Sequence, residues 1–124
     1  MGEADAATVA RLLDEGKLVV VDFHASWCAP CRAYSPKFTR IEREMRRAFP
    51  DAKFAFVSVD IDANQEIARE AKVRSVPTTV AWTAGRSLLG SRKKKQLLRF
   101  SGDRSWEEMV RTFSSLLEAA SRHE

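Results

Sequence analysis

Hydrophobic and polar positions change their spacing several times along the chain. Apolar residues recur every three or four positions in some segments, which predicts helices, and gather in short runs in others, which predicts strands. Helices are expected over residues 8–15, from about 28–30 to about 49–50, over 64–72 and from 105 onward. Strands are expected over residues 17–24, 53–60, 78–82 and 96–100.

This order of elements, α-β-α-β-α-β-β-α, predicts an α/β fold. Strands that alternate with helices form βαβ units, so a central mixed sheet of about four strands flanked by helices is expected. The last two strands have no helix between them and should pair antiparallel at one edge. A length of 124 residues suits a single domain, residues 1–124.

Single residues refine the expected helices. Pro36 falls inside the long helix and is expected to kink it. Asn64 and Ser105 stand where a side chain can cap the helix that follows. Glu107 and Glu108 would support the last helix from its first turn.

Composition narrows the class of protein. Hydrophobic residues make up 44% and charged residues 31% of the chain, which is typical of a globular protein. The longest apolar runs are strand-sized, so no membrane span is expected. Glu3 and Asp5 near the start argue against a secretory signal in this sequence.

The net charge of +4 is unevenly distributed. No acidic residue occurs between Glu70 and Asp103, and eight Lys and Arg fall there. The simplest interpretation is a solvated surface. The alternative is a docking patch, above all the run from Arg92 to Lys95, for an acidic partner, nucleic acid or anionic lipid. No aromatic residues interleave this run, which argues against nucleic acid.

The two cysteines, Cys28 and Cys31, are separated by two residues, which suits a reversible redox pair or half of a metal site. They lie between a predicted buried strand and a predicted helix start, where unpaired N–H groups are expected to lower the pKa of Cys28. Cys28 is therefore the expected nucleophile on a substrate disulfide and Cys31 the resolving thiol. Asp22, on an otherwise apolar strand, is expected to be buried with a raised pKa and to accept the proton of Cys31.

These residues belong to a longer pattern. It comprises Trp27-Cys28-Ala29-Pro30-Cys31-Arg32, Asp22-Phe23, Pro36, Val59-Asp60-Ile61-Asp62, Val73-Arg74-Ser75-Val76-Pro77-Thr78, Gly85 and Gly102. With this order and spacing, the chain resembles the thioredoxin family over about residues 8–120. The resemblance implies a thioredoxin fold and a protein-disulfide reductase without a bound cofactor, whose redox-active group is a Cys28–Cys31 disulfide. It implies disulfide-containing proteins as substrates, and a thioredoxin reductase or a small dithiol as electron donor.

The resemblance also implies a surface that binds substrate. Pro77 would follow a cis peptide bond in the Val76-Pro77-Thr78 loop and would hold the backbone of Val76 beside the dithiol. On this basis the substrate-binding residues are Trp27, Ala29, Pro30, Val76, Pro77, Ser101 and Gly102. No residue is assigned to a metal.

Four departures from the family pattern modify these expectations. Ala29 replaces a glycine. Ser58 stands where the family has a buried lysine, which would raise the pKa of Asp22 further. The first family strand has no counterpart. The segment 77–102 is longer than in the family, and by the family topology its basic hairpin tip points away from the dithiol, where it would select a partner or a location.

Other interpretations stay open. A thioredoxin-fold adaptor could dock an acidic partner through the basic hairpin that begins at Arg86 and ends at Arg99. Residues 23–32 also resemble the tryparedoxin and nucleoredoxin branch. A structural zinc site needs four ligands, and only His24 and His123 accompany the cysteines. One reduced cysteine pair suits the cytoplasm, with the mitochondrial matrix or another reducing compartment as the alternative.

Overall fold

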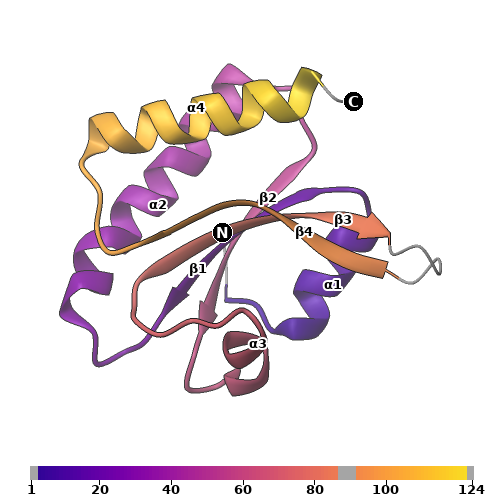
Figure 1. Ribbon diagram of the computed structural model, residues 1–124. Helices are drawn as coiled ribbons and strands as arrows, with labels where there is room; N and C mark the ends of the chain where they lie inside the picture. The colour runs from indigo at the N-terminus through magenta and orange to yellow at the C-terminus, as the bar shows by residue number, and fades with distance from the viewer. Residues whose placement is uncertain (1–2, 87–91, 123–124) are drawn as a thin grey trace.

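The computed structural model describes residues 3–122 except 87–91, and the side chains of Arg86 and Arg92 lie outside that description. Its elements follow the predicted order (Figure 1). They are α1 (Ala6–Asp14), β1 (Leu18–His24), α2 (Ala29–Ala48), β2 (Phe54–Asp60), α3 (Gln65–Glu70), β3 (Thr78–Arg86), β4 (Arg92–Ser101) and α4 (Trp106–Arg122).

The four strands form one mixed sheet in the order β2-β1-β3-β4. β1 pairs parallel with β2 and antiparallel with β3, and β3 pairs antiparallel with β4. The expected α/β sheet with an antiparallel pair at one edge is therefore confirmed. Where the family has a first strand, the described residues hold one isolated bridge, in which the Ala4 N–H donates to the Ser58 carbonyl oxygen at 2.8 Å.

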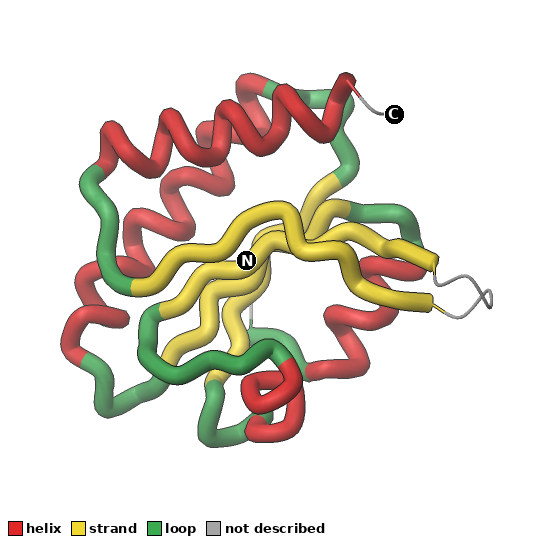
Figure 2. The backbone as a smooth tube through the Cα atoms, viewed as in Figure 1, coloured by secondary structure: helices red, strands yellow, loops and turns green. Residues whose placement is uncertain are grey.

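Helices cover both faces of the sheet (Figures 1 and 2). β1 is apolar on both sides, so it belongs to two cores at once. Val19, Val21 and Phe23 pack with α1 and α3, whereas Leu18 and Val20 pack with α2 and α4. The second core is rich in aromatic rings and contains Tyr34, Phe38, Phe54, Phe56 and Phe113. This packing fixes the start of α2 against the carboxyl end of β1, which is where the chemistry lies.

The structure confirms one of the two helix caps that the sequence predicted. Ser105 Oγ accepts the Glu108 N–H at 3.2 Å and donates to Glu108 Oε1 at 3.1 Å, which confirms the expected cap of α4. α3 begins after Asn64 as predicted, but the Asn64 side chain does not cap it and donates instead to the Asp60 carbonyl oxygen at 3.1 Å. Pro36 lies inside a continuous α2, and its kink stays a prediction.

The β3–β4 hairpin is longer than predicted. Strands were expected over 78–82 and 96–100, but β3 extends to Arg86 and β4 begins at Arg92. Lys93, Lys94 and Lys95 therefore lie in a strand and pair with residues 83–85, so the prediction that the basic residues form the tip is wrong for these three. Lysine is tolerated here because β4 is an edge strand whose side chains reach water. Residues 87–91, the rest of the predicted tip, lie outside the described residues.

Candidate functional site

The two cysteines sit at the start of α2, one turn after β1 ends. Cys28 is the N-cap residue, and its sulfur accepts the Cys31 N–H at 3.2 Å. Pro30 occupies the first turn, where its missing N–H breaks no helical hydrogen bond. Cys28 and Cys31 form a disulfide with their Cα atoms 5.3 Å apart. The predicted cysteine pair therefore lies at a helix start, in its disulfide form, and Ala29 and Pro30 form its two-residue spacer.

Both cysteines are well covered. Cys28 is 4% exposed and Cys31 is 3% exposed, and with Ala25 they pack against Ile61 and Val76. Cys28 Sγ lies 3.4 Å from the Val76 carbonyl oxygen. Two segments 48 residues apart in sequence thus meet at the reactive sulfur.

The loop before β3 has the predicted shape. The Val76–Pro77 peptide bond is cis, as expected. The Gly102 N–H donates to the Pro77 carbonyl oxygen at 2.8 Å, and Gly102 has φ +86°, a conformation that favours glycine. Thr78 Oγ1 donates to the Ser75 carbonyl oxygen at 2.7 Å and lies 2.9 Å from Ser101 Oγ. The structure therefore brings the predicted residues 76–77 and 101–102 together.

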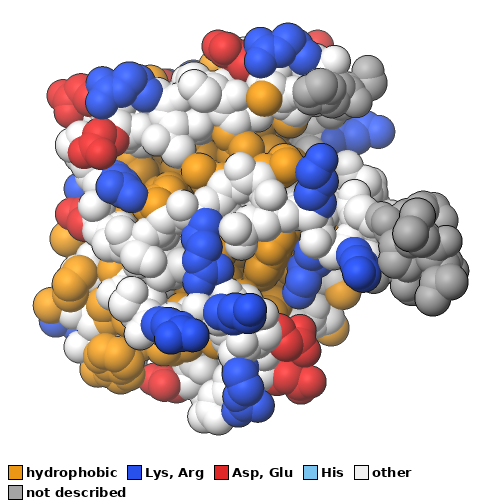
Figure 3. All heavy atoms as spheres, in the orientation of Figure 1, with side chains coloured by type: hydrophobic (Ala, Val, Ile, Leu, Met, Phe, Trp, Pro, Cys, Tyr) orange, Lys and Arg blue, Asp and Glu red, His pale blue; other side chains and the backbone are white. Residues whose placement is uncertain are grey.

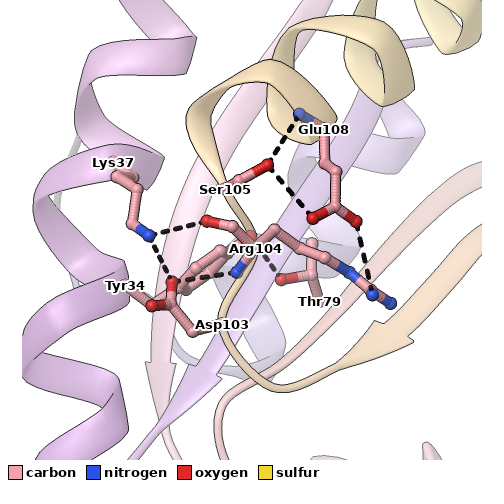
Figure 4. Close-up of polar contacts among 7 residues, drawn as sticks. All are labelled: Tyr34, Lys37, Thr79, Asp103, Arg104, Ser105 and Glu108. Atoms are coloured by element: carbon pink, nitrogen blue, oxygen red, sulfur yellow. Dashed lines mark hydrogen bonds and ion pairs between the residues drawn. The ribbon is translucent and has the colours of Figure 1, made fainter.

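A polar cluster ties the loop between β4 and α4 to α2 (Figure 4). Lys37 Nζ lies 2.7 Å from Asp103 Oδ1 and donates to the Arg104 carbonyl oxygen at 2.6 Å. The Tyr34 hydroxyl lies 2.7 Å from Thr79 Oγ1, and burial raises the Tyr34 pKa. The Lys37 contacts hold the chain after Gly102, and the Tyr34 contact holds β3, against the helix that Cys28 caps.

Trp27 stands beside the dithiol and is 66% exposed, so it lines a surface rather than the core. Its indole N–H donates to Asp62 Oδ2 at 2.9 Å. Asp62 follows β2, and its own N–H donates to Asp60 Oδ1 at 2.8 Å. Sequence reasoning did not assign a site role to Asp62. The available signal was its place after the carboxyl end of a strand parallel to β1.

Asp22 is buried on β1, as predicted, with 1% of its surface exposed. Neither carboxylate oxygen has a hydrogen-bond partner among the described residues. Burial raises the Asp22 pKa from 3.8 to about 6, while nearby His24 lowers it and Glu3 raises it. Ser58 is the residue that pairs with Asp22 across β1 and β2. It is also the residue that the sequence analysis identified as standing in place of a lysine.

His24 ends β1 on the dithiol side. Its Nε2 lies 3.0 Å from both carboxylate oxygens of Glu3. An open cavity of about 480 Å³ is lined by residues that include His24, Cys31 and Pro36. Water therefore has access to the region beside Cys31 from the α2 side of the sheet.

Comparison with known proteins places this site in a family. The family model for Thioredoxin matches residues 4–102. A thioredoxin of Mycolicibacterium smegmatis is 36% identical over 110 residues, which cover 80% of this chain and 96% of that protein. The match to the structure of Fasciola hepatica thioredoxin covers 99% of this chain and 98% of that protein, with 33% sequence identity and a TM-score of 0.65. The bifunctional thioredoxin reductase/thioredoxin of Mycobacterium leprae is 37% identical over 102 residues, so the match spans 80% of this chain but only 21% of that protein.

The chain belongs to the thioredoxin family. Together with the Cys28–Cys31 pair, this makes it a thiol-disulfide oxidoreductase of the protein-disulfide reductase type. The adaptor and the tryparedoxin or nucleoredoxin alternatives are not favoured, because the matched relatives are named thioredoxins.

The redox-active group is a disulfide of the chain itself, and proteins of this family need no added cofactor. Across residues 3–86 and 92–122, no three His, Cys, Asp or Glu side chains gather as a metal site would require. His123, one of the two histidines considered as ligands, lies outside the described residues. Within the same ranges, no helix combines the length and apolar character needed to cross a membrane.

Proposed function

We propose that the chain reduces disulfide bonds of other proteins with Cys28 as nucleophile and Cys31 as resolving thiol. The Cys28 thiolate attacks one sulfur of the substrate disulfide, and the other substrate sulfur leaves as a thiolate and takes up a proton. Cys31 then loses its proton and displaces the substrate sulfur from Cys28. The substrate leaves as a dithiol with two additional electrons, and Cys28 and Cys31 are left as a disulfide.

The observation that supports this order of attack is the capping position of Cys28. Its sulfur accepts the Cys31 N–H at 3.2 Å and lies at the positive end of a 20-residue helix. Both effects stabilise a thiolate over a thiol. Cys31 is the third residue of α2 and is bonded to Cys28, so its sulfur can reach the Cys28 sulfur in the resolving step.

Asp22 is the proposed acceptor for the proton of Cys31. Both of its oxygens lack a hydrogen-bond partner among the described residues, so either can accept. With a pKa of about 6 it is a stronger base than an exposed aspartate, yet mostly ionised at neutral pH. The open cavity beside His24 gives water access to Cys31, the thiol that loses the proton.

The proposed substrate is an extended polypeptide that lies across the residues around the dithiol. Trp27 offers an exposed ring, held by Asp62, on one side of Cys28. On the other side, Val76 and the bonded pair of Pro77 and Gly102 present backbone that a second chain can follow. Ala29, Pro30 and Ser101 complete this surface in the proposal.

The oxidised pair must be reduced again for a second turnover. We assign this step to a thioredoxin reductase or to a small dithiol, either of which supplies two electrons and two protons. The name of the Mycobacterium leprae relative, which pairs the two activities, supports the first. A reversible cysteine pair works as a reductant only in a reducing compartment, so we propose the cytoplasm, with the mitochondrial matrix or another reducing compartment as the alternative.

Trapping of the mixed disulfide tests the order of attack. Reduced Cys31→Ser should accumulate a covalent complex with a disulfide protein such as insulin and should lose catalytic turnover, because the resolving thiol is gone. Cys28→Ser is the matched control, since it removes the same number of thiols and should form no complex. Mass spectrometry measures the complex, and circular dichroism checks that both variants fold. A complex formed by Cys28→Ser but not by Cys31→Ser would reverse the assignment.

The reduction potential of the Cys28–Cys31 pair tests the direction of the reaction. Equilibration with glutathione should give a value near that of thioredoxin, about −270 mV. A value at or above about −180 mV would make the chain an oxidant or isomerase and would refute the reductase role.

A further inference from the structure

A groove of about 1240 Å³ runs over the sheet on the face that carries α1 and α3. Its floor and walls are apolar and include Val9 and Leu13 of α1, Ile67 of α3, and Trp82 and Ala84 of β3. It exists because α1 and α3 cover β1 and β3 but leave the edge strand β4 without a helix on this side (Figure 2). Figure 3 views the hollowed face, where apolar side chains are surrounded by Lys and Arg.

The charge of the groove is predominantly positive. Five cationic side chains line it against two acidic ones, Asp14 and Glu70. The cationic residues are Lys72, Arg74, Lys93, Lys94 and Arg99, and all five are exposed. An occupant with carboxylates at some positions and apolar side chains at others would complement both the rim and the floor.

Two of these cations are held in place before anything binds. The Arg99 guanidinium donates to the carbonyl oxygens of Ala71 and Lys72 at 2.7 and 2.8 Å, which bridges β4 to the end of α3. Lys94 Nζ lies 4.6 Å from the centre of the Trp82 ring. Cations that are already ordered lose less side-chain entropy when a partner binds.

One end of the groove lies beside the dithiol loop. Ser75 and Ser101 line that end, and both contact Thr78, the residue after the cis proline. Val76, next to Ser75, touches Cys28 Sγ through its carbonyl oxygen. From Ser101 the groove follows β4 to Lys94, which at the rise of a strand is roughly 23 Å, enough for about seven extended residues.

We infer that this groove docks an acidic, extended segment that flanks the reacting cysteine in the proteins that the chain reduces. The inference rests on the proposed function, because the groove selects substrates for the same dithiol. The sequence suggested an acidic partner at the run from Arg92 to Lys95. The contact lies on one face of the hairpin, where Lys94 and Arg99 line the groove together with Arg74.

A polypeptide fits the groove better than nucleic acid does. Trp82 is only 5% exposed and Lys94 covers its ring, so it offers no face on which a base could stack. The free edge of β4 offers backbone donors and acceptors that an extended peptide can pair with. Alternating side chains of such a peptide would point in turn to the apolar floor and to the basic rim.

The test uses synthetic peptides in which one cysteine forms a mixed disulfide with 2-mercaptoethanol. Seven flanking residues alternate valine with glutamate, glutamine or lysine, on either side of the cysteine. The reduced protein should show kcat/KM in the order glutamate, glutamine, lysine, and the preference should grow with flank length up to about seven residues. Equal values for the three peptides would overturn the inference.

Two double variants test whether the groove causes the preference for the glutamate peptide. Lys94→Glu combined with Arg74→Glu should lower kcat/KM for the glutamate peptide roughly tenfold, mainly through KM, because two attractive pairs become repulsive. Arg43→Glu combined with Arg111→Glu is the matched control, since it makes the same change of charge on exposed positions of α2 and α4. An equal loss in both double variants would show that net charge, not the groove, selects the substrate, and would overturn the inference.

Two further measurements separate the possible failures. Reduction of 2-hydroxyethyl disulfide, which has no flanking residues, reports on the dithiol alone. If the wild-type protein does not reduce it, the proposed function fails. If it does reduce it and shows no preference among the peptides, only the groove inference fails. Stronger competition by a single-stranded oligonucleotide than by a free glutamate–valine peptide would also overturn the inference.

Discussion

Replacement of the buried Asp22 by asparagine should change the free energy of unfolding in a pH-dependent way. The difference between the variant and the wild type should favour the variant more at high pH than at low pH. Burial raises the folded-state pKa of Asp22 from 3.8 to about 6, so the folded state binds a proton more tightly than the unfolded state. The contribution of Asp22 to wild-type stability therefore falls as pH rises from about 3.8 to about 6, and the full penalty remains above that range.

The size of the effect follows from the shift. The folded-state pKa of Asp22 exceeds its unfolded-state value by about two, which destabilises the folded protein by about 3 kcal/mol at pH 8. Only about 0.5 kcal/mol of this destabilisation is present at pH 4. Asparagine also leaves polar atoms buried, but that cost does not change with pH. The stability difference between Asp22→Asn and the wild type should therefore shift by about 2.5 kcal/mol in favour of the variant between pH 4 and pH 8.

Urea unfolding of the oxidised proteins measures this shift, because the disulfide removes cysteine ionisation from the comparison. With an ordinary m-value, 2.5 kcal/mol corresponds to a shift of about 1 M in the midpoint. Asp51→Asn is the matched control, since it removes the same charge from an exposed turn. A difference between Asp22→Asn and the wild type that stays constant from pH 4 to pH 8 would refute the buried-carboxylate explanation.

Two other substitutions test single contacts. Asp62→Ala removes the oxygen that accepts the Trp27 indole N–H at 2.9 Å, so KM for a protein disulfide should rise several-fold in steady-state assays. Reduction of 2-hydroxyethyl disulfide should change little, and equal losses on both substrates would contradict this role of Asp62. Ser105→Ala removes the N-cap of α4, and denaturant unfolding should show a loss of about 1 kcal/mol. No measurable loss would mean that the packing of α4, not its cap, fixes where the helix begins.

The parts of the fold that the sequence predicted well have strong local signals. α2 and α4 have long apolar stripes at helical spacing, and their buried residues, such as Phe38 and Phe113, are those of the stripes. β1 is apolar at almost every position, which identified Asp22 as a buried exception. Cys28 could be placed at a helix start because a buried strand precedes it and Pro30 follows.

The features that the sequence did not predict depend on distant contacts. Trp27 and Asp62 are 35 residues apart, and no local pattern pairs them. The lysines of β4 gave no strand signal, because an exposed edge strand needs neither apolar alternation nor β-branched residues. The register shift opposite Ala81 and Trp82 is likewise set by pairing between strands.

The chemistry of this protein depends on residues that are close together in the sequence, whereas its choice of substrate depends on residues that are far apart. The dithiol and Asp22 lie in one short segment and are buried, so dissolved salt should hardly change their energetics. The groove is assembled from α1, α3 and β4, and its cations are exposed, so their attraction for carboxylates should weaken as the Debye length falls from about 10 Å at 0.1 M salt to about 3 Å at 1 M. High salt should therefore remove the preference for acidic peptides while reduction of 2-hydroxyethyl disulfide and the pH dependence of stability persist. A preference for acidic peptides that survived 1 M salt would contradict this explanation, because the valines that face the apolar floor are the same in all three peptides.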